Sequence, residues 1–346
     1  AYSSACRVDP DCFTISASRA LRIRGGKSFP LSDLVDKSFS FISRSSPQRV
    51  LGAAACIYGA NAVFLVAAPR LALRSYGLDP IEDVCAGSIP GEQECVSLSR
   101  SMAQIDGLIL LGFAMMVGCL ASSRATETAL AVGAGTWGAT MVAWQLRGWN
   151  LRRVSNIGNG WKLCLSWQLL VSLVFTTRFS FFQSIAVCCN VVWWGALSVA
   201  LVSAPETTHR FLITSTRPPS SSSSSLPPPY PPSVYASGLV TFLLEALGFQ
   251  LLAPVLVTAL LTLSKVFSWD LPPARAVGYG IASWYLSVVK FWRRGSKNPL
   301  AGGQTEGGGS MPLSSRAVPT YFYVAVNGLI VYLIFSSTSP YRSTAQ

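Results

Sequence analysis

The sequence predicts an all-α integral membrane protein with eight transmembrane helices, arranged as two tandem parallel four-helix repeats. Three observations predict this fold class. Half of the 346 residues are hydrophobic, and only 12% are charged, whereas a soluble domain carries about 25% charged residues. The mean hydropathy is +0.42. The apolar residues are also gathered in runs long enough to cross a bilayer, so we expect much of the surface to face hydrocarbon.

Eight apolar runs approach the length of about 20 residues that a helix needs to cross about 30 Å of hydrocarbon. They cover residues 50–69, 104–121, 128–146, 161–177, 181–204, 234–264, 276–292 and 318–337. The sixth run is long and contains Pro254, where we expect a tilt or a kink. The seventh run is the weakest, because Lys290 lies inside it. The eight runs therefore predict eight spans.

The first and fifth runs resemble each other closely. Residues 59–69 and 195–205 are identical at seven of eleven positions, at an offset of 136. A Leu-Gly-Phe triplet recurs at the same offset, at 111–113 and 247–249. The third and seventh runs share Ala-Val-Gly, Trp and Arg-Gly at offsets of 145 to 147, and the fourth and eighth share Leu-x-Val-x-Leu-x-Phe at 160. Matches in this order predict a duplication, with repeats at 50–178 and 179–337. An even number of spans per copy makes the repeats parallel.

Segments of different composition flank and interrupt the repeats. Residues 1–49 form a basic, Ser-rich tail with eight Lys/Arg, typical of an organellar presequence or its remnant and equally of a basic tail beside a membrane. A Pro/Ser linker at 216–233, a Gly-rich loop at 300–312 and a C-terminal tail at 338–346 complete the chain. The short loops on the side opposite the N-terminus are basic, which favours that side as the cytoplasmic, stromal or matrix side. The basic N-terminal tail favours the opposite orientation, so the topology stays open.

The residues that most catalytic centres need are scarce. His209 is the only histidine, which argues against haem and di-iron sites. The sequence has no Cys-x-x-Cys, no Cys/His cluster and no phosphate-binding loop, so we expect no enzyme, no metal site and no required cofactor. Of the nine cysteines, Cys85 with Cys95 and Cys6 with Cys12 are the two candidate disulfide pairs. The net charge is +12. The basic residues lie at the ends of the apolar runs, so we expect them to contact lipid headgroups and not nucleic acid.

Polar residues inside the spans are the candidate functional residues. Glu245 and Asp106 are carboxylates that a transporter would use for protons or cations. The alternative places Asp106 at the interface and Glu245 against a neighbouring helix or a headgroup. The candidate pigment ligands are Asn61, Gln145, Gln168, Asn190, Gln250, Asn327 and His209. Amides ligate chlorophyll magnesium, but they more often form hydrogen bonds between helices.

Two classes of function follow. The favoured one is a non-catalytic accessory or linker subunit of a large organellar membrane complex, in a photosystem–antenna supercomplex of the thylakoid rather than in a mitochondrial respiratory complex. Chlorophyll, carotenoid or structural lipid would be its ligands, and residues 1–49 and 210–234 would order against other membrane subunits. The alternative is a small-solute transporter or channel built from the duplicated four-helix repeats, which predicts that Glu245, Gln250, Asn61 and Asn327 converge on one cavity at the membrane midplane.

Overall fold

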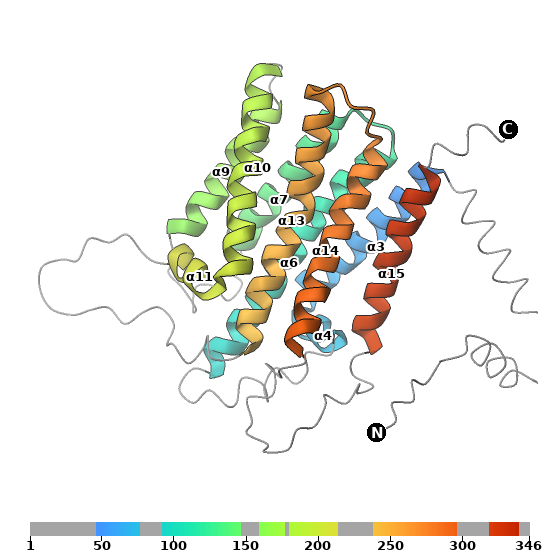
Figure 1. The fold of residues 1–346 in the computed structure, drawn as a ribbon. Coiled ribbons are helices and arrows are strands. Elements are labelled where there is room, and N and C mark those ends of the chain that lie inside the picture. Colours follow the sequence, from blue (N-terminus) through green and yellow to red (C-terminus); the bar gives the residue numbers. More distant parts are fainter. Residues whose placement is uncertain are drawn as a thin grey trace, which may run out of the picture. The chain divides into compact units, whose positions relative to one another are not determined.

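The computed structural model describes residues 46–76, 92–146, 159–176, 180–213, 238–295 and 318–338, all within the unit formed by residues 45–346. These residues contain helices and no strand (Figure 1). The helices are α3 (Pro47–Ala67), α4 (Pro69–Ser75), α6 (Glu92–Ala121), α7 (Thr126–Leu146), α9 (Asn159–Thr176), α10 (Ser180–Ser203), α11 (Pro205–Ile213), α13 (Gly238–Val266), α14 (Pro273–Gly295) and α15 (Val318–Ser337). Nearly all of the predicted tails, linker and Gly-rich loop lie outside the described residues, as do Cys6, Cys12 and Cys85 of the candidate disulfide pairs. Cys95 lies on α6, and neither disulfide is tested.

The eight apolar runs coincide with the eight long helices, and two short helices follow the first and fifth of them. Proline sets these boundaries. Helix α3 ends before Pro69 and α10 ends before Pro205, because proline has no N–H to continue the ladder. Each proline then starts the next helix, α4 or α11, at a first position where no N–H is needed.

Helices α6 and α13 end in the same type of cap. Ser123 and Ser268 have positive φ angles of 53° and 52°. The following N–H groups, of Arg124 and Trp269, donate to the carbonyl oxygens five residues earlier, at 3.3 and 2.8 Å. This is the pattern of a Schellman cap, which satisfies carbonyl groups that a helix end leaves open. The cap turns the chain sharply into α7 and α14.

Helices α6 and α13 lie at the centre of the bundle, where they pack against each other. Helix α6 packs against α3 and α7, and α7 packs against α9. Helix α13 packs against α10 and α14, and α14 packs against α15. The pairs α3–α15 and α9–α10 join the two halves at opposite sides, as Figure 1 shows.

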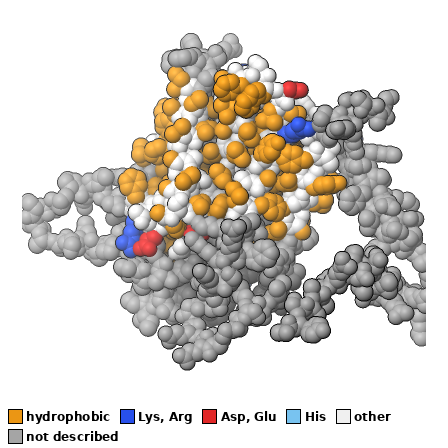
Figure 2. All heavy atoms as spheres, viewed as in Figure 1, with side chains coloured by type: hydrophobic (Ala, Val, Ile, Leu, Met, Phe, Trp, Pro, Cys, Tyr) orange, Lys and Arg blue, Asp and Glu red, His pale blue; other side chains and the backbone are white. Residues whose placement is uncertain are grey.

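Four of the described helices are long and apolar enough to cross a membrane: Pro47–Ala67, Val96–Ala121, Ile185–Ser203 and Val240–Val266. The stretch Val324–Ser337 is a shorter apolar helix. Large apolar side chains also face outward, with Leu173 64% and Val192 69% exposed, and Figure 2 shows apolar side chains over most of the described part of one face. A surface of this kind indicates a transmembrane protein, because contiguous exposed apolar area is unfavourable in water.

Candidate functional site

A cavity of about 220 Å³ lies among α3, α6, α13, α14, α15 and the end of α4. Its polar lining residues are Asn61, Tyr76, Asp106, Gln250, Tyr285, Ser287 and Asn327. Aromatic and aliphatic side chains, including Phe242, Phe249 and Trp284, form the rest of the wall. An apolar pocket with a few convergent polar groups is the usual form of a small-molecule site.

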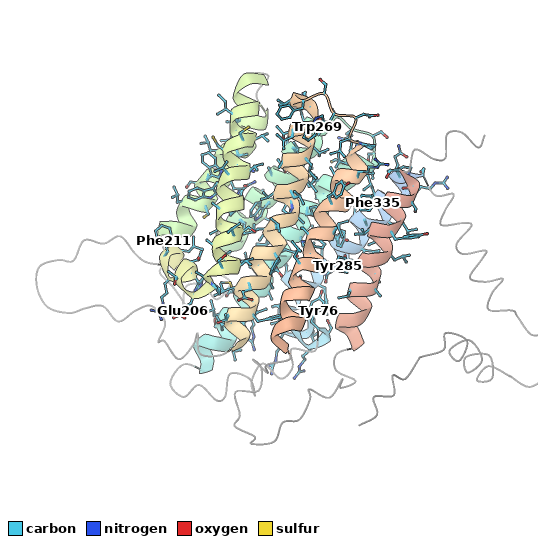
Figure 3. All side chains as sticks on the ribbon, viewed as in Figure 1. Tyr76, Glu206, Phe211, Trp269, Tyr285 and Phe335 are labelled. Carbon is cyan, nitrogen blue, oxygen red and sulfur yellow. The ribbon has the colours of Figure 1, made fainter. Side chains whose placement is uncertain are left out.

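Tyrosines hold two of the amides in place. The Tyr76 hydroxyl donates to Asn61 Oδ1 at 2.5 Å, and the Tyr58 hydroxyl donates to Asn327 Oδ1 at 2.7 Å. Burial raises the pKa of Tyr76 to about 12; its hydrogen bond to Asn61 lowers that pKa, and the nearby negative charge of Asp106 raises it. Tyr76 therefore stays protonated and keeps donating at neutral pH. Tyr285, on α14 (Figure 3), donates to the Val324 carbonyl oxygen at 2.5 Å.

Asp106 is the acidic residue among the described residues of the cavity wall. Its Oδ1 is buried and has no hydrogen-bond partner among the described residues. Because α6 begins at Glu92, Asp106 lies at the middle of a long helix and not one turn inside it, as the apolar run from residue 104 suggested. A buried carboxylate oxygen without a donor is costly, which favours a functional role over an interfacial one.

The transporter hypothesis predicted that four polar residues line one cavity, and three of them do. Asn61, Gln250 and Asn327 line the same cavity. Glu245 is buried, with 1% of its surface exposed, but it does not line the cavity, although its neighbour Ala246 does. Asp106 therefore takes the place in this cavity that the hypothesis gave to Glu245.

The other candidate ligands lie elsewhere. Trp194 Nε1 donates to Gln168 Oε1 at 2.9 Å, and Gln168 Nε2 donates to the Ala134 carbonyl oxygen at 3.0 Å. Trp167 Nε1 donates to Asn190 Oδ1 at 3.2 Å. These bonds join neighbouring helices, which is the structural role that span amides usually have. The side chain of Gln145 lies outside the described side chains, and pigment binding stays a prediction for the whole set.

His209 lies on α11, away from the cavity, and is 1% exposed. Burial lowers its pKa to about 4, so the folded protein keeps it neutral where the unfolded chain would protonate it. The stability that this neutral histidine permits is present above a pH of about 6.5 and is lost as the pH falls toward 4.

We expect wild-type protein to lose about 2 kcal/mol of stability through His209 between about pH 7 and about pH 5. His209→Leu should remove this part of the acid sensitivity, because leucine binds no proton. The measurement is the thermal unfolding midpoint of the full chain in detergent at the two pH values. Glu206→Gln, on the exposed face of the same helix, is the control. Equal acid sensitivity of wild type and His209→Leu would contradict the assignment.

No protein-family model, curated protein or solved structure matches this chain. Among the described residues, no group of three or more His, Cys, Asp or Glu could hold a metal ion. The apolar helices indicate the class, a helical transmembrane protein. A more specific function has to be inferred from the cavity and from the contacts between the helices that surround it.

Proposed function

We propose that the chain is an eight-span membrane protein built from two copies of a four-helix unit, and that it is a transporter or channel for a small solute. The observation that carries the proposal is the cavity of about 220 Å³ with the carboxylate of Asp106 in its wall. Helices α3 and α6 of the first unit and α13, α14 and α15 of the second line this cavity. Solute sites of duplicated transporters commonly lie between the two copies.

Matching helix contacts support the duplication. A Cβ at Gly107 on α6 would lie 2.9 Å from the Ala62 carbonyl oxygen of α3. A Cβ at Gly248 on α13 would lie 2.9 Å from the Ser198 carbonyl oxygen of α10. Ala62 and Ser198 are separated by the sequence offset of 136 that relates the first and fifth runs. Small residues that let backbones approach are typical of membrane helix interfaces.

A second set of contacts relates α7 to α14. A Cβ at Gly133 would lie 3.1 Å from the Gly112 carbonyl oxygen, and one at Gly280 would lie 3.0 Å from that of Ala253. The partners on α6 and α13 are offset by 141, the same value that separates Gly107 from Gly248. Both sets of contacts therefore support a single alignment of the two central helices.

Aromatic contacts between the two units also occur in matching pairs. The ring of Trp284 on α14 lies 5.2 Å from that of Tyr58 on α3, while Trp137 on α7 lies 4.3 Å from Trp194 on α10. Tyr58 donates to Asn327 on α15, and Trp194 donates to Gln168 on α9. In each unit, an aromatic side chain of the first helix therefore donates a hydrogen bond to an amide oxygen on the last helix of the other unit.

Cysteine labelling tests the cavity. Ala246→Cys would place a thiol in the cavity wall, and we expect it to react with methyl methanethiosulfonate in membranes. Ala253→Cys is the matched control, since Ala253 lies on the same helix, is fully buried and packs against Gly280. Mass spectrometry of the α13 peptide separates either thiol from the native cysteines. Equal protection of both thiols would overturn the proposed solute site.

The accessory-subunit hypothesis, with its photosystem, thylakoid and pigment terms, stays a prediction. It rests on residues 1–49 and 210–234, of which the structure describes only 46–49 and 210–213. Extraction in mild detergent separates the two functions. A linker subunit would be recovered only within a large complex, whereas a transporter would be recovered as a stable single chain or a small oligomer.

A further inference from the structure

We infer that the solute held in this cavity is a small organic cation, an amine with an apolar body, and that Asp106 binds its charged group. The inference rests on the proposed solute site and specifies its ligand class. Two features of the cavity point to it: the acidic group in its wall and the comparison with the equivalent pocket among α6, α7, α9, α10 and α13.

The described wall of the cavity holds one acidic group and no basic group. Among the described residues that line the cavity there is no lysine, arginine or histidine, and Asp106 is the one with an ionisable carboxyl group. Asp106 Oδ1 has no hydrogen-bond partner among the described residues. A buried carboxylate favours a partner of opposite charge that also donates a hydrogen bond. An ammonium group supplies both, whereas an anion would meet an uncompensated like charge.

The remaining wall suits an apolar body. Phe242, Phe249 and Trp284 present aromatic surface around the cavity, and aromatic faces attract cations as well as apolar groups. A cavity of about 150 Å³ holds one benzene ring, so the 220 Å³ available here would hold one ring with a short side chain. This size favours a small monoamine.

An equivalent but nearly filled pocket lies between the two units among α6, α7, α9, α10 and α13. Under the helix alignment above, Trp284 corresponds to Trp137, which lines two small voids of about 10 and about 40 Å³. The positions of Asp106, Gln250 and Ala246 are occupied there by Leu247, Ile109 and Ile105, and all three line the smaller void. The framework tryptophan is the same in both pockets, and the amide of Asn327 in the open cavity has a counterpart in Gln168. Asp106, Gln250 and Ala246 have only aliphatic counterparts in the small void, so the fold does not demand the carboxylate of Asp106 or the amide of Gln250.

The test measures binding of 2-phenylethylamine to the full chain in detergent, by titration calorimetry at neutral pH. The uncharged 2-phenylethanol and the anion 3-phenylpropionate are the comparison probes. We expect the amine to bind and the other two to bind at least about tenfold more weakly, since a hydrogen bond to a charged group contributes that much. Asp106→Asn should weaken amine binding by a similar factor.

Two further variants keep the result interpretable. Asp106→Leu introduces the residue of the equivalent pocket, and we expect it to fold and to lose amine binding. Glu127→Gln removes a carboxylate from an exposed ion pair with Lys265, and we expect it to bind the amine as wild type does. Equal affinity for amine and alcohol, full amine binding by Asp106→Asn, or no amine binding at all would overturn the ligand class. If Ala246→Cys is reactive in those cases, the proposed solute site still stands.

Discussion

Alanine at Gly107 or Gly248 is expected to lower the free energy of unfolding by about 1–3 kcal/mol. The added Cβ at Gly107 would lie 2.9 Å from both the Ala62 carbonyl oxygen and the Leu65 Cβ. At Gly248 it would lie 2.9 Å from the Ser198 carbonyl oxygen. A backbone carbonyl cannot rotate away as a flexible side chain can. The helix pairs α3–α6 or α10–α13 would therefore have to separate.

Gly52→Ala is the matched control for these two variants. A Cβ at Gly52, on α3, would meet nothing within 4 Å. Alanine also favours a helix by about 1 kcal/mol over glycine, so this variant should be slightly more stable than wild type. Thermal unfolding of the three variants in one detergent gives the comparison. Equal stability of Gly107→Ala and Gly52→Ala would contradict the close approach of α3 to α6.

The positions of the long helices were predictable, because a charge-free run of sufficient length is a local property of the sequence. Helix ends were less so, because caps and loops set them. Helix α6 begins at Glu92, well before the apolar run at residue 104, and the polar Ser99 and Ser101 near its start are buried. Hydropathy alone therefore did not show that Asp106 lies at the middle of its helix.

The duplication stays a prediction, and the glycine contacts favour another register for the two central helices than the Leu-Gly-Phe triplets suggested. The Leu-Gly-Phe triplets suggested an offset of 136, yet Gly112 packs against Gly133 and Trp137 of α7 while Gly248 packs against α10. The contacts favour 141 instead. Three residues common in membrane helices carry little information, and the face that a glycine presents depends on neighbours distant in sequence.

Three amides of the cavity were predicted, while its tyrosines were missed. Tyr76 follows a short helix after Pro69, a place where the sequence suggests an interfacial aromatic residue. Its contact with Asn61 depends on the turn at Pro69, which folds α4 back toward α6. Tyr285 was also missed, although it adjoins Trp284, an anchor of the repeat. An adjacent polar aromatic residue was the signal that would have found it.

Exchanging two cavity residues for their counterparts is expected to abolish amine binding without unfolding the chain. Ala246→Ile with Gln250→Ile would introduce into α13 the residues that α6 carries at Ile105 and Ile109. The larger side chains should fill much of the cavity. Each buried CH₂ contributes about 0.8 kcal/mol, so the double variant should be at least as stable as wild type. Titration calorimetry with 2-phenylethylamine and thermal unfolding are the two measurements.

The double exchange tests the duplication and the site together, because it uses only residues that the chain already places in its closed pocket. Leu252→Ile, a change to isoleucine on the same helix at a position outside the cavity lining, is the control and should bind the amine normally. A double variant that binds the amine as wild type does would place the site elsewhere. One that fails to fold would show that the two pockets are not equivalent, and would contradict the two-copy proposal. If the open cavity and the small void are built on the same helix contacts, the double variant should keep its stability and lose amine binding.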